Sequence, residues 1–286
     1  MTSGSSASVP LPRLHPRAVA SYVVIVVSLV LLLLPVLWMV LTAFKTTDEV
    51  FRVPPTIWPS EANWKPIAYA FSGSLPRFFL NSIIIAACTA VVTTVVGALT
   101  GYGISRARHW STSALLMFFL ASMAFPLPLL MISIYYLLSV LQLLNTYAAV
   151  IIGHMLLTLP IVVWLTKGFI DDLPVEVEQS AYIDGAGPLR ILFDMVLPMM
   201  RPGLAAAGLY VFVTSWNEFV FGLSFTSSTE MRPLPAGISL LFLQEFQYQW
   251  PEMMAVATVA TLPILLLFLA FQNQFVEGVT AGAVKH

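Results

Sequence analysis

Long apolar runs constrain this chain more than any other feature of its sequence. A helix needs about 20 consecutive apolar residues to cross the hydrocarbon of a bilayer, and several runs in these 286 residues reach that length. Hydrophobic residues make up 58% of the chain and charged residues only 9%, against roughly 25% charged residues in globular proteins. The sequence therefore predicts an all-α membrane protein that crosses the membrane several times.

Six apolar segments are predicted to span the membrane: 19–44, 78–104, 113–125, 146–165, 203–223 and 253–271. The third is short, and Pro126-Leu127-Pro128 separates it from another apolar run at 129–144. That run is either an outer interfacial helix or a seventh span. The predicted organisation is a disordered tail (1–18), a transmembrane domain (19–275) with a polar loop at 168–202, and a C-terminal tail (276–286).

The distribution of positive charge favours six spans. With the N-terminus inside, six spans place eight of the 13 Lys and Arg residues on the cytoplasmic side. These are Arg13, Arg17, Arg106, Arg108, Lys167, Arg190, Arg201 and Lys285. A seventh span would leave only five inside, and cytoplasmic loops carry an excess of Lys and Arg. Both termini and the loop 168–202 are therefore predicted to be cytoplasmic.

The sequence lacks the residues that are characteristic of several classes of function. The net charge of −1 gives no electrostatic reason to bind nucleic acid. The single cysteine, Cys88, and four scattered histidines form no metal-ligand spacing. The sequence has no H-E-x-x-H or G-x-S-x-G motif, which argues against an intramembrane enzyme, and no catalytic residue is predicted. No G-x-x-x-x-G-K-[ST] sequence is present to bind ATP phosphates, so no cofactor is expected on this chain.

The loop 168–202 is predicted to form two short helices. Asp172 can cap a first helix that has Pro174 in its first turn and runs to about Asp184. Gly185 then breaks the helix because it can adopt a positive φ. Pro188 begins a second helix that Leu197-Pro198 ends.

The first of these helices is amphipathic. Leu173, Val177 and Ala181 recur every fourth residue and form an apolar stripe that faces the membrane domain or the groove of a partner. An amphipathic connector resting on lipid is the alternative. The acidic character of the loop disfavours that alternative, because anionic lipid would repel it.

The loop resembles the cytoplasmic EAA loop of permease subunits of ATP-binding-cassette importers. That family has the pattern E-A-A-x3-G-x9-I-x-L-P, and this chain reads Gln179-Ser180-Ala181, Gly185, Met195 and Leu197-Pro198. The Ile183-Asp184-Gly185-Ala186 run is similar to the sugar-importer branch. Further segments resemble the maltose-type permeases: 54–59, Asn63-Trp64, 79–82, 215–219 and 278–285.

The resemblance implies a multi-pass subunit in the cytoplasmic (inner) membrane of a prokaryote. It implies a second homologous permease, two cytoplasmic ATPase subunits that bind ATP and Mg, an extracytoplasmic solute-binding protein and a carbohydrate substrate, with lipid around the spans. The residues it assigns to ATPase coupling are Glu176, Glu178, Gln179, Ser180, Ala181, Asp184, Gly185 and Ala186. Gln179 replaces the Glu that can pair with a basic residue of the ATPase. The adjacent Glu178 is a substitute for it, and the grip on the ATPase is expected to rest on shape and the apolar stripe.

Polar residues within spans are costly and are often functional. Trp216, Asn217 and Glu218 supply the aromatic, amide and carboxylate groups that sugar sites use, and they are candidates for the translocation path. Adjacent residues cannot all face the same way on a helix, and Glu218 has the alternative role of bracing helix packing. His154 is expected to bond a neighbouring helix.

An ion- or proton-coupled secondary transporter is the alternative function. It predicts inverted repeats, broken helices and intramembrane carboxylates at matching places. The sequence shows one carboxylate well inside a span and no clear repeat.

Overall fold

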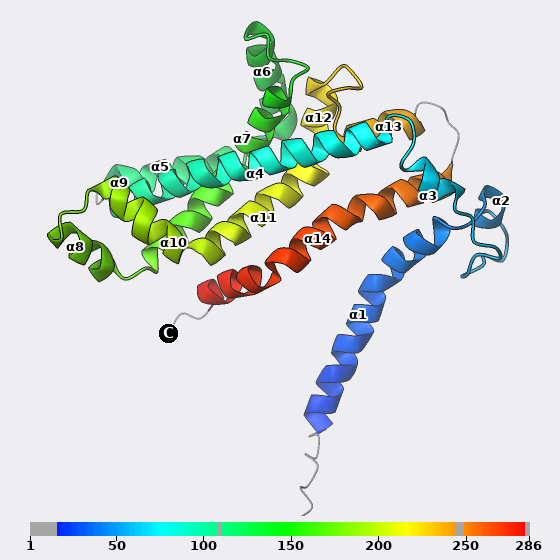
Figure 1. Cartoon of the computed structure of the whole chain (residues 1–286), viewed down its shortest axis with the longest axis horizontal. Helices are drawn as coiled ribbons and strands as arrows, with labels where there is room; N and C mark the ends of the chain where they lie inside the picture. The colour runs from blue at the N-terminus through cyan, green and yellow to red at the C-terminus, as the bar shows by residue number, and fades with distance from the viewer. Residues whose placement is uncertain (1–15, 108–109, 244–248, 284–286) are drawn as a thin grey trace, which may run out of the picture. The chain divides into compact units, whose positions relative to one another are not determined.

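The computed structural model describes residues 16–107, 110–243 and 249–283, and within these ranges it contains helices and no strand. The chain divides into two compact units. One comprises the residues up to Ile67 with Trp250–Thr258, and the other comprises Ala68–Gln249 with the residues from Val259 onward. Figure 1 shows the helices in chain order. The described residues therefore confirm the all-α prediction.

Three helices form the centre of the larger unit. They are α4 (Leu75–Arg106), α7 (Tyr147–Asp171) and α11 (Arg201–Asn217), which lie side by side (Figure 1). Gly97 and Gly101 let α4 approach α7 closely, because a Cβ at Gly97 would collide with the Val162 side chain. The Thr166 hydroxyl donates a hydrogen bond to the Gly97 carbonyl across this contact, at 2.9 Å. Gly97 and Gly101 form a G-x-x-x-G sequence, in which small residues let two helix backbones approach closely.

Four helical segments are long and apolar enough to cross a membrane: Ala20–Thr42, Leu75–Arg106, Tyr147–Asp171 and Trp250–Gln274. Two bent helix pairs raise the total to six if each pair counts as one span. The described residues therefore carry four to six candidate spans.

The first bent pair is α5 (Trp110–Ser122) and α6 (Leu127–Val140), which meet at an angle of 100°. Pro126 is the N-cap of α6, in line with the predicted interruption at Pro126-Leu127-Pro128. The second pair joins the residues Pro188–Met199 to α11 at 79°. Proline has no N–H to donate and fixes φ, so it commonly marks such boundaries.

The fifth predicted span is shorter than expected. α11 ends at Asn217, and a separate short helix, α12, covers Val220–Phe225. Glu218 has an extended backbone, with φ −72° and ψ 128°. The prediction of one continuous helix over 203–223 was therefore wrong, because Glu218 leaves the helix to cap the next one. α13 (Leu234–Leu243) then packs on α4.

Both ends of the described chain are more helical than predicted. α1 (Pro16–Thr42) begins three residues before the expected boundary at residue 19. α14 (Trp250–Ala283) includes residues 276–283, which were assigned to a tail. Residues 1–15 and 284–286 lie outside the described ranges, and so do the predicted tail structures that fall on them.

The smaller unit contains α1, α2 (Thr47–Val50) and a compact loop. Lys45 is buried, donates to the Thr56 carbonyl at 2.5 Å and lies 4.5 Å from the centre of the Trp38 ring. One oxygen of Glu49, in α2, accepts bonds from the Ser60 N–H at 2.8 Å and the Thr56 hydroxyl at 3.0 Å. These polar contacts order the loop between residues 45 and 60. α3 (Lys65–Tyr69) follows it.

Candidate functional site

The segment resembling the EAA loop is folded as a helical hairpin. α8 covers Val175–Ile183, and Asp184 is its C-cap. Gly185 follows with φ +82°, the left-handed conformation that favours glycine. Helical structure resumes through α9 (Pro188–Ile191), the π-helical η1 (Leu192–Val196) and α10 (Leu197–Met199). Figure 1 shows α8 and α9 together at one end of the α4–α7–α11 group.

Two details of this hairpin differ from the sequence prediction. Asp172 is the C-cap of α7, and Pro174 is the N-cap of α8, so the predicted capping by Asp172 was wrong. The α7 helix extends to Asp171 rather than Leu165. Asp172, which was expected to cap the start of α8, therefore caps the end of α7. The second helix continues to Met199, because Pro198 lies in the first turn of α10, where it is tolerated.

The apolar stripe of α8 faces the rest of this chain. Ala181 is 2% exposed and belongs to a cluster with five other buried residues, against which Leu173 also packs. Those five are Ile170, Ile191, Leu192, Val196 and Met200. The expectation that a partner grips this stripe was therefore wrong for Ala181, since burial in the chain's own core already removes its side chain from solvent.

A different apolar surface is exposed on the hairpin. It consists of Tyr182, Ile183, Leu189 and Phe193, whose side chains lie on both sides of the Gly185 turn. Ile183 is 87% exposed and Leu189 is 70% exposed. We call these four residues the hairpin tip. Sequence reasoning did not single them out as a surface, although Ile183 and Leu189 flank the predicted turn closely.

The other residues assigned to ATPase coupling divide between the two sides of the hairpin. Glu176, Gln179, Ser180, Asp184 and Gly185 are exposed, and Ala186 is half-buried. The Ser180 hydroxyl donates to the Glu176 carbonyl within α8, at 2.9 Å. Gln179, which stands where the motif has Glu, is thus on the solvent-exposed side of α8.

Glu178 lies on the inner side of α8. Its side chain is 7% exposed and forms an ion pair with Arg106 at 2.5 Å. Tyr102 donates a further hydrogen bond to the second carboxylate oxygen, at 3.1 Å. The carboxylate is thus occupied by groups of α4, and it is not presented beside Gln179 as a substitute for the motif Glu.

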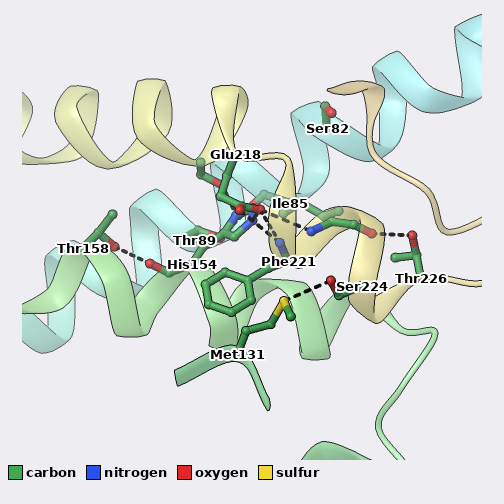
Figure 2. A network of polar contacts seen from close by, with 12 residues as sticks. Ser82, Ile85, Thr89, Met131, His154, Thr158, Glu218, Phe221, Ser224 and Thr226 are labelled. Atoms are coloured by element: carbon green, nitrogen blue, oxygen red, sulfur yellow. Dashed lines mark hydrogen bonds and ion pairs between the residues drawn. The ribbon is translucent and has the colours of Figure 1, made fainter. Parts of the chain in front are cut away.

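A second polar cluster lies where α11 ends. Figure 2 shows His154 of α7 beside Glu218, with Thr158 one turn further along. The Nε2 atom of His154 lies 2.9 Å from Glu218, and its Nδ1 atom lies 2.5 Å from the Ser215 hydroxyl. Glu218 also accepts bonds from the backbone N–H groups of Phe221 and Gly222, at 3.0–3.2 Å. These contacts cap α12 and attach it to α7.

Of the three candidate path residues, only Asn217 is exposed. Trp216 is 4% exposed and stacks on Phe212, with the ring centres 5.9 Å apart. The Glu218 side chain is 7% exposed and turned toward His154. Asn217 donates only to the Val213 carbonyl of its own helix among the contacts recorded for it.

Thr214 and Tyr210 are half-exposed and lie about one and two turns before Asn217 on α11. Spacings of three and four residues place side chains on one helix face, so these three form a polar row. Within the described residues, no group of His, Cys, Asp and Glu side chains is arranged to hold a metal ion.

Comparison with known proteins identifies close relatives over nearly the whole length. A family described as "Binding-protein-dependent transport system inner membrane component" matches residues 93–280. The sulfoquinovosyl glycerol transport system permease protein SmoH of Agrobacterium fabrum is 33% identical over 254 residues, which cover 88% of this chain and 89% of that protein. The trehalose/maltose transport system permease protein MalG of Thermococcus litoralis is 30% identical over 257 residues, or 90% and 92% of the two chains.

A solved structure supports the same fold. A chain of a bacterial ABC transporter involved in the import of the acidic polysaccharide alginate superposes with a TM-score of 0.77. The superposition covers 91% of this chain and 96% of that chain, at 16% sequence identity. At this identity the likeness establishes the fold alone.

Proposed function

This chain belongs to the family of binding-protein-dependent transport system inner membrane components, and on that premise we propose that it carries a carbohydrate. It is a permease subunit of an ATP-binding-cassette importer and not an enzyme. Membership of this family sets aside the alternative of an ion- or proton-coupled carrier. The named substrates of two relatives, sulfoquinovosyl glycerol and trehalose or maltose, support a carbohydrate.

The hairpin tip is the proposed docking surface for the ATPase. Exposed apolar residues that flank a fixed turn fit a groove in a partner, and burying them there would stabilise the assembly. The exposed side chains of Glu176, Gln179, Ser180 and Asp184 surround the tip and supply polar contacts at its rim. The exposure of the tip is the observation that carries this proposal. ATP and Mg²⁺ would bind to the ATPase subunits.

The proposed topology has six spans and both termini in the cytoplasm. The spans are α1, α4, the α5–α6 pair, α7, α11 with α12, and α14. The hairpin then lies on the cytoplasmic side and the loop ordered by Lys45 and Glu49 on the outer side. The excess of Lys and Arg on the inner side supports this orientation. A solute-binding protein would approach from outside.

The polar row on α11 is the proposed contribution to the translocation path. Asn217, Thr214 and Tyr210 present amide and hydroxyl groups away from the buried side of the helix. Trp216 and Glu218 would hold this row in place by packing and capping. A second, homologous permease would supply the opposite wall.

Co-purification of the ATPase with a tagged form of this chain tests the docking surface. In Ile183→Glu a charge enters the proposed interface. Hot-spot residues cost about 2 kcal/mol or more on truncation, or roughly 30-fold in affinity. We therefore expect the recovered ATPase to fall by at least about tenfold.

Val53→Glu is the matched control. Val53 is 90% exposed in the loop between residues 45 and 60, which the proposal does not place in the interface, so the same change there should leave ATPase recovery unchanged. Equal recovery in Ile183→Glu and the wild type, with the permease still folded, would contradict docking through the hairpin tip. Failure to recover any ATPase with the wild-type chain would contradict the proposed partnership itself.

A further inference from the structure

The ends of α4 and α7 and the inner side of α8 meet at one side chain. Arg106 is the last residue of α4. Its Nη2 atom donates to Glu178 of α8 at 2.5 Å and to the Ile170 carbonyl of α7 at 3.0 Å. Its Nε atom donates to the same Glu178 oxygen at 2.8 Å. A single guanidinium thus connects α4 to α7 and α8, whose contacting residues lie more than 60 residues later in the sequence.

The chemistry of this connection makes it directional and strong. A guanidinium presents its N–H donors in a planar fork, and charge-assisted bonds to a carboxylate are about twice as strong as neutral ones. The Ile170 carbonyl lies in the last turn of α7 and also accepts a bond from the Leu173 N–H at 3.2 Å. Tyr102 completes the carboxylate's coordination from one turn earlier on α4.

Short segments connect α8 to its neighbours along the chain. Residues 172–174 link it to α7, and residues 184–187, which include two glycines, link it to α9. A cavity of about 240 Å³ lies beside the ion pair, lined by residues of α4 and α8 that include Ser105 and Gln179. Apolar packing of Ala181 against Ile170 holds α8 toward α7. Toward α4, the contacts that hold α8 are those of Glu178 with Arg106 and Tyr102.

Two neighbouring residues of α8 face opposite sides of the helix. Glu178 is buried against α4, whereas Gln179 is exposed on the outer side. Further contacts reinforce the inner side, since Ser105 of α4 donates to Asp171 of α7 at 2.5 Å. Lys167 pairs with the same Asp171. α4 and α7 are thus joined to each other at the point where α8 is held.

We infer that Glu178 and Arg106 are positioning residues that make α8 move as one body with the ends of α4 and α7. This inference rests on the proposed function, because it assigns the inner side of α8 a role only if an ATPase moves the hairpin tip. With the ion pair intact, displacement of the hairpin is passed to two spans. Without it, α8 shifts relative to α4 and the spans follow incompletely.

The test measures whether α8 moves relative to α4. Nitroxide labels are placed at Val91→Cys, which is exposed on α4, and at Val175→Cys at the start of α8, with Cys88→Ala removing the native thiol. Fifteen residues of helix separate Val91 from Arg106, roughly 22 Å, a range suited to pulsed EPR. The complete importer is purified through a tag on this chain and measured without nucleotide and after ATP–vanadate trapping.

With the pair intact, the distance between the labels should stay constant on trapping, within the roughly 1–2 Å of ordinary helix shifts. In Glu178→Gln the distance distribution should broaden and shift beyond that range. The charge exchange Glu178→Arg with Arg106→Glu should restore the constant distance, which a loss of general stability would not do. Asp194→Asn is the control, because it removes a carboxylate of the same segment from an exposed pair with Arg190.

An equal shift in the wild type and in Glu178→Gln would overturn the inference, and so would a constant distance in both. If Glu178→Gln does not fold, Arg106→Lys keeps the charge, loses the planar fork and takes the same test. ATPase recovery separates the two proposals: it should be normal in Glu178→Gln, whose hairpin tip is unchanged. Absence of ATPase from the wild-type preparation would instead overturn the proposed function and, with it, this inference.

Discussion

At the residue scale, Glu218 shows how a carboxylate inside a membrane protein is held by its own chain. It accepts bonds from two backbone N–H groups and lies beside His154. A buried carboxylate without such partners would be very costly. At the break between α11 and α12, the Glu218 side chain thus binds the first free N–H groups of α12.

Glu218→Ala should lower the stability of the permease. It removes a helix cap, a loss of about 0.5–2 kcal/mol, and leaves His154 without its acceptor. The measurement is thermal unfolding in detergent. Asn217→Ala is the control, because Asn217 is exposed and bonds only its own helix in the recorded contacts. A Glu218→Ala protein that unfolds at the temperature of Asn217→Ala would contradict the capping role.

Glu49 gives the outer loop a predicted dependence on pH. Burial by itself raises the pKa of Glu49, but hydrogen bonds from Ser60 and Thr56 and the charge of Lys45 outweigh burial. The pKa is therefore lowered from its ordinary value of 4.5. A lowered pKa in the folded state contributes stability that is present above 4.5 and is lost as the pH falls through the folded value.

The loop should accordingly become sensitive to protease only at acidic pH, below 4.5. Limited proteolysis of the detergent-purified protein across a pH series measures this transition. In Glu49→Gln the loop should be sensitive at every pH, whereas Asp48→Asn, at an exposed neighbouring carboxylate, should behave as the wild type. A Glu49→Gln loop that keeps the wild-type acid transition would contradict the assignment.

At the element scale, close packing of α4 on α7 depends on small residues. A Cβ at Gly101 would lie 2.9 Å from the Lys167 backbone nitrogen and still closer to the Thr166 hydroxyl, and backbone cannot move aside as a flexible side chain can. At Gly103, only two residues further along, a Cβ would meet no atom within 4 Å. Gly101 and Gly103 therefore allow the same substitution to be compared at a crowded and at an open position of one helix.

Gly101→Ala should destabilise the permease by about 1–3 kcal/mol through overpacking. Gly103→Ala should leave stability unchanged or raise it by up to about 1 kcal/mol, because alanine favours the helix. Thermal unfolding of both variants under one set of conditions compares them directly. Equal unfolding temperatures would show that α4 and α7 are not in the close contact described.

At the scale of the whole molecule, the proposed six-span topology would put the hairpin tip and the loop near Lys45 on opposite sides of the membrane. Single cysteines at Val53 and at Ile183, in a Cys88→Ala background, occupy two highly exposed positions. A membrane-impermeant maleimide applied to intact cells should label Val53→Cys and not Ile183→Cys. Permeabilised cells should give labelling at both, which serves as the reactivity control. Labelling of Ile183→Cys in intact cells would contradict a cytoplasmic hairpin.

Much of the fold was predictable because it depends on local rules. Apolar length predicted the four helices that are long enough to cross a membrane, and Gly185 predicted a turn that the structure confirms with φ +82°. The hairpin was predictable within a few residues. Its N-terminal boundary was not, because α7 extends through Asp171 and makes Asp172 its own cap.

The candidate site was predictable only in part. The residues of the EAA-like segment were found by spacing, but their division between the two sides of α8 was not. An apolar stripe must be buried somewhere, and periodicity does not distinguish the chain's own core from the groove of a partner. The hairpin tip was missed because the Gly185 turn separates Tyr182 and Ile183 from Leu189 and Phe193 in the sequence.

The sequence by itself determined the class of protein, the approximate spans, the turn at Gly185 and the family to which the chain belongs. These follow from apolar length, from the conformational freedom of glycine and from ordered motifs. Only the tertiary structure decided that Glu178 faces inward and Gln179 outward, and that Glu218 is a cap. The physical reason is that each carboxylate is held by a partner more than 60 residues away, Arg106 and His154, and burial favours the orientation in which its charge is matched.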